Sequence, residues 1–538
     1  MDLIIYNADI RTMDAAQPRV SSVGIRDGLI AVCGSDSEVL ELRNPSTAVI
    51  NAGGRCVIPG FNDSHMHMLN YATLTDGADL TAVRSLDDLH TALKTHIKKK
   101  DAAPGAEVRG WGFNQDYFDV KTIPNRHDLD LVSTAHPIYI SRACGHVWVL
   151  NSMALTRAGI TKETPDPAGG EILRRPGGEP TGVLTENAIQ LAKANRKPLE
   201  KDAIKDLILS AAPDLQKMGI TSIQTDDFGG ILRPTDVCAA YTELAAEGKL
   251  GFRAAEQCHA HNMAELETIL ALPQPPGNLR SMFRLGPVKL LADGSLGART
   301  ALLRDGYADK PGTRGVSVYE YAELAALVKT AHASGRSLAV HAIGDGAIEM
   351  VLDSFEAAQK EYPGKNVRHG VVHAQITDRA LLNRFKDLGV MAYVQPVFIH
   401  ADSRIAPDRV GSLAATSYAF RTLRELGSRT PFGTDCPVES FNPFHNLYCA
   451  VSRKGLDGYP QGGFNINEAL SVSGAVTAYT ADGAYATFEE HIKGMIKPGY
   501  YADMVMLSRN IFNEETEAIK DTEAVMTVLG GRIVHSVL

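Results

Sequence analysis

The stretch RCVIPGFNDSHMHM, residues 55–68, begins as an apolar β-strand and ends in two histidines separated by one residue. A short apolar run bounded by glycine and polar residues is typical of a buried strand in a parallel sheet. Polar residues directly after such a strand lie at its carboxyl end, where an α/β barrel carries its functional groups. The stretch therefore predicts the first strand of a β/α fold.

Seven further strand-like runs follow this first one, and helical patterns such as YAELAALVKTAHASG lie between them. The eight runs are CVIPGFNDSH (56–65), ITSIQTD (220–226), FRAAEQC (252–258), LGPVKLLAD (285–293), SLAVHAI (337–343), GVVHAQ (370–375), GVMAYVQ (389–395) and RTPFGTD (429–435). Eight such units favour a closed barrel over an open sheet. We predict an α/β protein built on an eight-stranded parallel β/α (TIM-type) barrel over residues 58–489.

Both ends of the chain carry short β-rich runs with turn signals, and neither end has enough strands to bury a sheet face alone. We therefore predict that residues 1–57 and 490–538 join in one small β-sandwich. Two separate hairpins on the barrel surface are the alternative. Residues from about 76 to 200 contain Pro- and Gly-rich turns and their own strand-like runs, which predicts a subdomain inserted after barrel strand 1.

The composition limits the function classes. The chain has 538 residues, and 54 Lys and Arg against 63 Asp and Glu give a net charge of −9. The charges are spread along the chain, so neither nucleic acid nor an anionic membrane is an expected partner. The first residues, MDLIIYNADIRTMD, lack a basic segment followed by a long apolar run, which favours a cytoplasmic protein. We expect a small-molecule substrate and leave a homodimer open.

Histidines, one aspartate and one lysine gather at or near the predicted carboxyl ends of the strands. On an extended chain, His65 and His67 share one face with Cα atoms about 6.5 Å apart. The candidate metal ligands are His65, His67, Lys289, His341, His373 and Asp435. Nitrogen and carboxylate ligands suit zinc or a similar divalent ion. The sequence therefore predicts a metal centre of one or two ions.

Each candidate also has a simpler explanation. A single strand histidine such as His341 or His373 is often a packed core residue, Asp435 could cap a helix, and the Lys289 stem could extend to solvent. Taken together they favour a metal site, because one barrel geometry would bring all of them to the same place.

Lys289 stands in the apolar run GPVKLLADG, where burial and nearby cations would lower its pKa towards the neutral amine. A neutral amine can add carbon dioxide to form a carbamate, an anion able to bridge two metal ions. We therefore predict a carbamylated Lys289.

Several motifs together resemble the amidohydrolase superfamily, in particular its amidohydrolase-3, YtcJ-like branch. They are VIPGFNDSHMH, GHVWVLNSMAL, TGVLTENA, VKLLADGSLGARTALL, VHAIGDGAI, HAQ with GVMAYVQP, GTDCPVES and GMIKPGYYADMVMLS. The resemblance implies a metal-dependent barrel with a split β-sandwich, and it assigns the same six residues to the metal centre. Many relatives carry Glu immediately before the strand-six histidine, where this chain has Val372.

The expected reaction is hydrolysis of a carbon–nitrogen bond, of the non-peptide amide or formamide type, by a metal-bound hydroxide. Asp435 would be the catalytic residue, taking a proton from the attacking water and returning it to the leaving amine. Trp111, Asp116, His400 and Phe441 are candidate substrate-binding residues. The alternatives are a mononuclear deaminase or cyclic imide hydrolase with an unmodified lysine, and a non-catalytic barrel.

Overall fold

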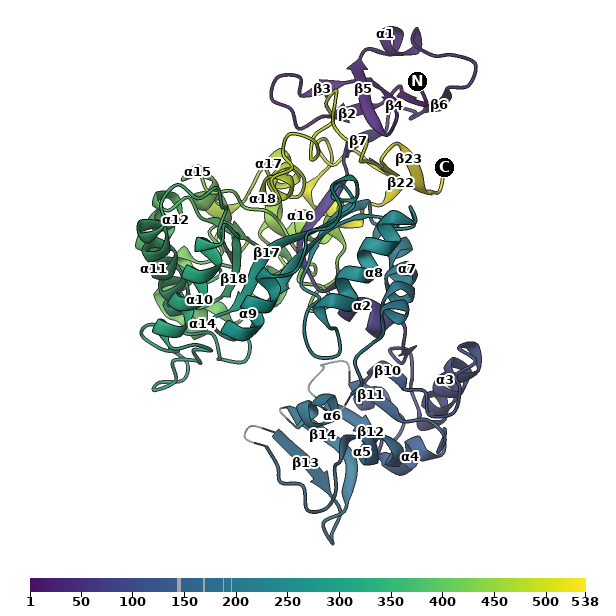
Figure 1. Cartoon of the computed structure of the whole chain (residues 1–538), viewed down its shortest axis with the longest axis vertical. Coiled ribbons are helices and arrows are strands. Elements are labelled where there is room, and N and C mark those ends of the chain that lie inside the picture. Colours follow the sequence, from purple (N-terminus) through teal and green to yellow (C-terminus); the bar gives the residue numbers. More distant parts are fainter. Residues whose placement is uncertain (143–146, 168–169, 187, 195) are drawn as a thin grey trace. The chain divides into compact units, whose positions relative to one another are not determined.

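The structure is a computed structural model that describes residues 1–538 except 143–146, 168–169, 187 and 195 (Figure 1). It divides into two compact units. The first contains Met1–Met68, Ala212–Phe228 and Cys238–Leu538, and the second contains Leu69–Ala211 and Gly229–Val237. Among the helices that the structure describes, none is long and apolar enough to cross a membrane.

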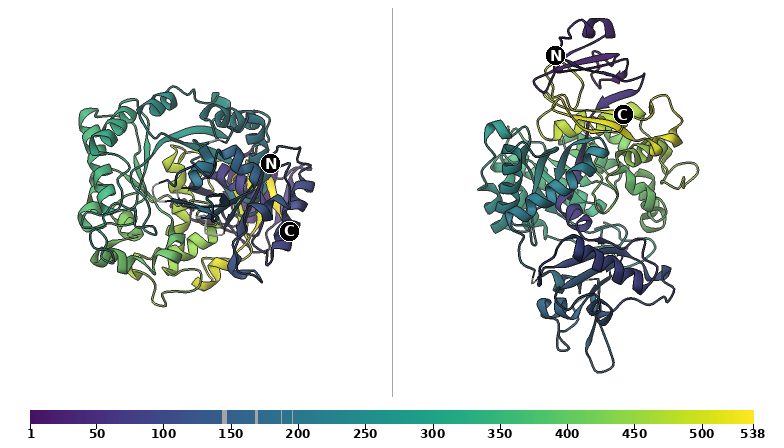
Figure 2. Two further views of the ribbon diagram at one scale, coloured as in Figure 1. Left: turned by 90° about the horizontal axis from the view of Figure 1, so that it is seen from below. Right: turned by 90° about the vertical axis from the view of Figure 1, so that its right-hand side faces the viewer.

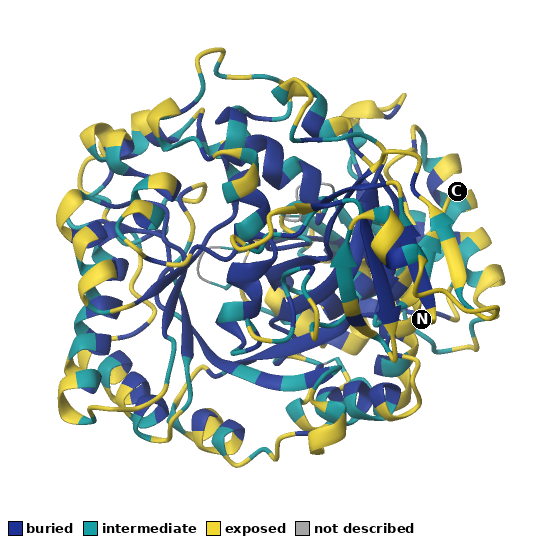
Figure 3. Cartoon of the chain, turned by 90° about the horizontal axis from the view of Figure 1, so that it is seen from above, coloured by how far each residue is buried: buried dark blue, intermediate teal, exposed yellow. Residues whose placement is uncertain are grey.

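Seven parallel strands form the barrel sheet of the first unit, in the order β20-β19-β18-β17-β16-β15-β8. They are β8 Phe61–Met66, β15 Ile220–Thr225, β16 Arg253–His259, β17 Phe283–Leu291, β18 Leu338–Ala342, β19 Gly370–His373 and β20 Met391–Tyr393. The residues of these strands are mostly buried, as the dark blue strands of Figure 3 show. Because all seven strands are parallel, their carboxyl ends meet at one edge.

The predicted eighth strand, residues 429–435, is not confirmed as a strand, although the segment forms backbone hydrogen bonds to the neighbouring strands on both sides. This segment makes one parallel bridge, between Val394 and Phe432. On its other side the Ser64 N–H donates to the Phe432 carbonyl at 2.8 Å. The Val394 N–H donates to the Pro431 carbonyl at 3.1 Å, and the Gly433 N–H donates to the Val394 carbonyl at 3.0 Å. The extended stretch ends at Asp435, where φ is +60°. The barrel is therefore nearly closed, with this segment between β20 and β8.

The first predicted strand, residues 56–65, is divided between two sheets. Its first part is β7 (Cys56–Pro59), and its second part begins β8. Pro59 cannot donate a ladder hydrogen bond, and at Gly60 a Cβ atom would lie 2.2 Å from the Thr221 Oγ1. The proline and the close approach at Gly60 explain why the chain changes sheet at this point.

Helices follow most of the barrel strands, and Figure 2 shows the green helices as an outer ring around them. The longer helices of this region are α9 Met263–Leu270, α10 Tyr321–Ala333, α11 Asp345–Glu361, α12 Arg379–Asp387, α15 Phe420–Glu425, α16 Pro443–Ser452, α17 Val472–Ala478 and α18 Ala481–Ala486. Two more, α7 Lys201–Lys217 and α8 Pro234–Ala246, flank β15 in the sequence.

Strands from both ends of the chain share one six-stranded sheet, in the order β23-β22-β21-β7-β2-β3. Its strands are β2 Asp9–Arg11, β3 Arg19–Val20, β7, β21 Met504–Leu507, β22 Ala524–Leu529 and β23 Arg532–Ser536. A four-stranded sheet contains β1 Leu3–Tyr6, β4 Ser22–Arg26, β5 Leu29–Gly34 and β6 Ala48–Asn51. Ile5, Val23 and Met504 belong to one apolar cluster that draws on both sheets. The division into a sandwich of 1–57 and 490–538 stays a prediction.

The second unit has its own six-stranded sheet, in the order β13-β14-β12-β11-β10-β9. Its elements are α2 Met68–Thr75, β9 Ala78–Asp79, α3 Leu86–Lys99, β10 Val108–Phe113, α4 Arg126–Asp130, β11 Ile138–Arg142, β12 Val147–Leu150, α5 Ser152–Ala158, β13 Gly170–Arg174, β14 Pro180–Glu186 and α6 Ile189–Ala194. Residues 145–146 of the motif GHVWVLNSMAL and residue 187 of TGVLTENA lie outside the described residues.

Two buried histidines form a hydrogen-bonded pair beside the amino-terminal ends of β18 and β19. His369 Nδ1 accepts from the Leu338 N–H at 3.1 Å, so its Nε2–H donates to His332 Nδ1 at 2.8 Å. His332 Nε2 in turn donates to the Tyr362 carbonyl at 3.0 Å. Burial, with the nearby His332 charge, lowers the pKa of His369 from 6.5 to about 3. His369 is therefore neutral in the folded protein, and both of its ring nitrogens are already engaged in hydrogen bonds.

This pair predicts acid sensitivity. Between pH 6.5 and about 3, the His369 ring binds a proton in the unfolded chain but not in the folded chain. The free energy of unfolding should therefore fall as the pH is lowered through this window, by roughly 1.4 kcal/mol per pH unit from this group. The free energy of unfolding, measured with urea at several pH values, should depend less steeply on pH in His369→Gln than in the wild type. The exposed-site variant His491→Gln is the control, and equal slopes in all three proteins would contradict the prediction.

Candidate metal centre

His65 and Asp435 meet at the carboxyl end of the barrel. His65 is buried near the end of β8, and its Nε2 lies 3.4 Å from Asp435 Oδ1. His67, just beyond β8, places its Nε2 3.1 Å from the same oxygen. Asp63 fixes the backbone on both sides, because one of its oxygens accepts from the His65 and Thr434 N–H groups. The strand and the neighbouring segment thus present these three side chains together.

The two other predicted histidines lie beside this pair. Ligand atoms of His65, His373 and Asp435 all lie within 4.8 Å of one another. The His373 ring centroid is 5.6 Å from that of His65 and 4.5 Å from that of His341. Because β18 and β19 are neighbours in register, His341 and His373 emerge at the same edge. The structure therefore brings the four predicted histidines and Asp435 into one cluster.

A hydrogen bond orients each histidine ring through one of its nitrogens. The Nδ1 atoms of His65 and His373 bond to the side-chain oxygens of Gln257 and Gln395, at 2.7 and 2.8 Å. His67 Nδ1 donates to the Asp226 carbonyl at 2.9 Å. Metal-binding histidines usually hold their second ring nitrogen in this way, which sets the tautomer and the ring orientation. In these three residues the Nε2 atom is left to face the cluster.

His341 is held through the opposite nitrogen. Its Nε2 donates to the Gly294 carbonyl at 3.0 Å, and Asp293 Oδ1 lies 3.3 Å away. Asp293 is itself fixed by the N–H groups of Ile343 and Gly344. In His341 the Nδ1 atom is therefore the one available as a ligand.

Lys289 lies on β17 and is buried, with 2% of its side chain exposed. Its Nζ is 3.1 Å from Asp226 Oδ2, and the other oxygen of Asp226 is 3.3 Å from His259 Nδ1. Because the Asp226 carbonyl also accepts from His67, this residue connects Lys289 to the histidine cluster. All six predicted metal residues thus belong to one connected group.

The electrostatics favour an anionic Asp435 and a neutral His65. Burial raises the pKa of Asp435, but hydrogen bonds from His65 and His67 outweigh it and hold the pKa well below 3.8. Burial and the Lys289 charge lower the pKa of His65 to about 4. Burial also opposes a charge on His67, yet its contact with Asp435 and the Asp226 charge raise its pKa to about 9. A cation at Asp435 would compete with that proton.

The donor set fits a divalent metal ion. Several imidazole nitrogens and one carboxylate oxygen converge, and the outer nitrogens of their rings are already bonded. Imidazole and carboxylate are ligands that zinc and similar ions accept. The Asp435 carboxylate and the Nε2 lone pair of the neutral His65 ring face the same point, so a bound cation suits the site.

The four predicted substrate-binding residues have separate surroundings. Asp116 belongs to the second unit and pairs with Arg142 at 2.8 Å, and Trp111 lies on β10 of the same unit. In the first unit, His400 Nδ1 accepts from the Leu456 N–H at 3.2 Å, and Phe441 is buried. Their role in substrate binding stays a prediction.

Asp226 and His259, at the carboxyl ends of β15 and β16, were not among the predicted site residues. The rule that selected Asp435 at the end of a strand would also have selected Asp226. His259 and His261 repeat the His-x-His spacing of His65 and His67, so that signal was available too. The orienting residues Gln257 and Gln395 had no comparable signal, because an isolated glutamine in a strand marks no chemistry.

The barrel and the cluster at its carboxyl edge place this protein in the class of β/α barrels with a candidate metal site. Residues 48–535 match the sequence model of the Amidohydrolase family. The chain belongs to this family, as the residue motifs predicted. YtcJ of Bacillus subtilis (strain 168) is 32% identical over 99% of both chains.

Other relatives support the same assignment. The chain is 27% identical to the N-substituted formamide deformylase of Arthrobacter pascens, over 98% of this chain and 97% of that protein. An uncharacterized metal-dependent hydrolase from Pyrococcus horikoshii OT3 has a similar structure, with a TM-score of 0.79 and 28% identity, covering 96% of this chain and 99% of that one. The zinc-containing atrazine chlorohydrolase TrzN of Arthrobacter aurescens TC1 shares the fold, with a TM-score of 0.55 at 13% identity over 99% of this chain and 95% of that one.

Proposed function

We propose that this protein hydrolyses a carbon–nitrogen bond of a small amide or formamide, other than a peptide bond. The observation that carries the proposal is the convergence of His65, His373 and Asp435 within 4.8 Å, with both ring orientations fixed by glutamines. The likeness to an N-substituted formamide deformylase along nearly the whole chain supports this bond type.

The metal would be held by His65, His67, His341, His373 and Asp435, and we propose zinc because of the donor types. When bound, such an ion lowers the pKa of a water molecule and polarises a carbonyl group. Asp435 is the residue suited to proton transfer, because its carboxylate is ionised and faces the cluster. It would accept a proton from the attacking water and return it to the leaving amine.

The chemical state of the Lys289 side chain, carbamate or ammonium, distinguishes two forms of this centre. A carbamate on Lys289 would replace a positive charge by a negative one beside Asp226, 3.1 Å from the present Nζ, so this form would need more cationic charge, which a second divalent ion would supply. We propose this form for the amide hydrolase. The ammonium form instead neutralises Asp226 directly, and that ion pair favours a single-ion deaminase or cyclic imide hydrolase as the second candidate. The number of metal ions per chain distinguishes the two.

Removing the metal tests the proposal. The purified protein, assayed on a panel of N-substituted formamides and simple amides, should lose its activity about 100-fold or more after dialysis against a strong chelator, since metal-dependent hydrolysis needs the ion for both polarisation and water activation. Added zinc should restore the activity. A chelator already saturated with zinc is the control. Unchanged activity in protein verified as metal-free would exclude the metal-dependent reaction.

A further inference from the structure

A cavity of the first unit lies at the amino-terminal ends of β17 and β18, and no part of the proposed reaction uses it. Its volume is about 300 Å³, and its polar lining includes Gln274, Arg280, Arg284, Arg336, Ser337 and Thr487. Arg284 precedes Lys289 on β17 by five residues, which corresponds to about 16 Å along an extended strand. The cavity is therefore separate from the metal centre.

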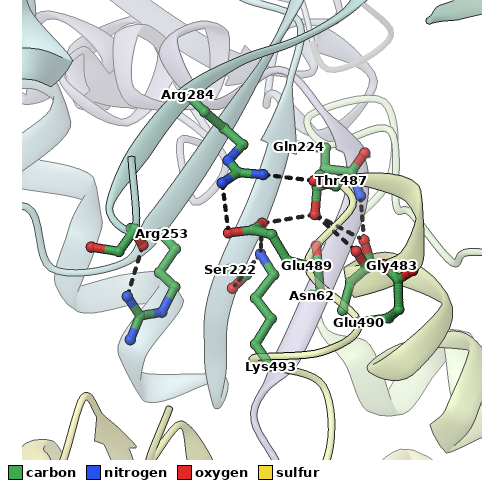
Figure 4. A network of polar contacts seen from close by, with 12 residues as sticks. Asn62, Ser222, Gln224, Arg253, Arg284, Gly483, Thr487, Glu489, Glu490 and Lys493 are labelled. Carbon is green, nitrogen blue, oxygen red and sulfur yellow. Dashed lines mark hydrogen bonds and ion pairs between the residues drawn. The ribbon is translucent and has the colours of Figure 1, made fainter. Parts of the chain in front are cut away.

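Three arginines line this cavity, and each is anchored by a backbone carbonyl. Arg336 donates to the Gly286 carbonyl at 2.9 Å, and Arg280 donates to the Pro275 carbonyl at 3.0 Å. Arg284 donates to the Thr487 carbonyl at 2.6 Å, as Figure 4 shows. These bonds hold the guanidinium groups in place and still leave them N–H donors, because a guanidinium has five.

The positive charge of the cavity is not balanced by its own lining. No Asp or Glu is among the lining residues. Among the described residues, Arg280 and Arg336 form no ion pair with a carboxylate. Glu489 does not line the cavity. Its carboxylate lies 3.3 Å from Arg284 and 2.7 Å from the buried Lys493, so it already pairs with two cations (Figure 4). Arg280 is exposed to solvent, so the partly buried Arg336 is the cation that most lacks a counterion.

We propose that this cavity binds a phosphate group, either inorganic phosphate or the phosphate of a small monoester. A cavity lined by three arginines and no carboxylate favours an anion, and a phosphate, with nearly two negative charges near neutral pH, offers more acceptor oxygens than a single carboxylate. The planar donor fork of arginine matches phosphate oxygens in pairs. Ser337 Oγ already accepts from the Arg368 N–H at 2.9 Å, so its own proton is available for donation.

Calorimetric titration of the full-length protein with inorganic phosphate tests this site, with sodium chloride at equal ionic strength as the reference. Wild-type protein should bind phosphate. Arg336→Gln should weaken the binding about tenfold or more, because a charge-assisted hydrogen bond and a counter-charge are lost. Arg280→Gln should weaken it in the same direction. Arg43→Gln, an exposed arginine that does not line the cavity, is the matched control and should bind as the wild type does.

Phosphate could also meet the metal centre, so Asp435→Asn is titrated in parallel. Phosphate binding that survives Asp435→Asn and is weakened by Arg336→Gln supports the proposal. Binding that is lost in Asp435→Asn and unchanged in Arg336→Gln overturns it, as does the absence of any phosphate heat beyond the chloride reference. A titration of glycerol phosphate then distinguishes the two sources, because a monoester that binds more tightly than inorganic phosphate must use the remaining volume of the cavity.

Discussion

Lys289→Ala is expected to lose most of the hydrolytic activity, about 100-fold or more, because a residue at the centre of the buried charge network is removed. In the carbamylated form the variant loses the anion that offsets two metal ions, so its metal content should fall together with its rate. In the ammonium form it leaves Asp226, with 3% of its side chain exposed, without its 3.1 Å partner. That loss should lower the free energy of unfolding by about 3–5 kcal/mol.

Chemical rescue separates these two forms. The shortened side chain leaves a space that a small molecule can enter. Acetate or propionate should restore part of the activity if Lys289 is a carbamate, because either supplies the missing negative charge. A short alkylamine should restore it instead if Lys289 acts as an ammonium beside Asp226. The measurements are rate, metal content and thermal stability, each with and without the additive.

Lys493→Ala is the matched control for the Lys289 experiment. Lys493 is also buried and also pairs with one carboxylate, Glu489, at 2.7 Å. The Lys493→Ala variant should also be less stable, because a buried carboxylate loses its partner, but it should keep its activity and metal content per folded molecule. A Lys289→Ala variant with near wild-type rate and full metal content would refute any role of Lys289 at the centre.

Asp435→Asn is the second variant with a large expected effect. Its turnover should fall about 10³-fold, within the range that general acid–base groups contribute. The amide has nearly the same shape as the carboxylate, so packing should change little. However, it cannot accept the proton from water, and it removes the negative charge that lies 3.1 Å from His67 Nε2. The pKa of His67 should fall accordingly, because hydrogen bonding to Asp435 and its charge help to raise it.

Because Asp435 would also hold metal, the rate and the metal content of this variant must be measured together. Loss of rate at full metal occupancy assigns the proton-transfer role, and loss of both assigns the ligand role. Asp309→Asn is the control, since this exposed carboxylate pairs only with Arg299 among the described residues, at 2.6 Å. An Asp435→Asn enzyme with wild-type turnover would remove Asp435 from the mechanism.

The barrel could be predicted because its signals are local. Apolar runs alternating with helical patterns gave the positions of seven strands, and polar residues after those runs marked the carboxyl edge. At residues 429–435 the predicted strand is not confirmed, because the segment makes only one bridge although it forms hydrogen bonds to both neighbouring strands. The apolar pattern also predicted one strand across Pro59 where the structure has two, because hydropathy alone does not show that the chain passes from one sheet to another.

By itself the sequence determined which residue types follow each strand, and hence that His65, His67, His341, His373 and Asp435 share one edge of a parallel barrel. This follows because strand direction and the alternation of side chains are properties of the local backbone. Only the tertiary structure decided the partners: Gln257 and Gln395 on the histidine rings, Asp226 on Lys289, and β21 beside β7 from the two chain ends. Such contacts join residues far apart in the chain, and they depend on distance and burial in the packed barrel, which no short stretch of sequence encodes.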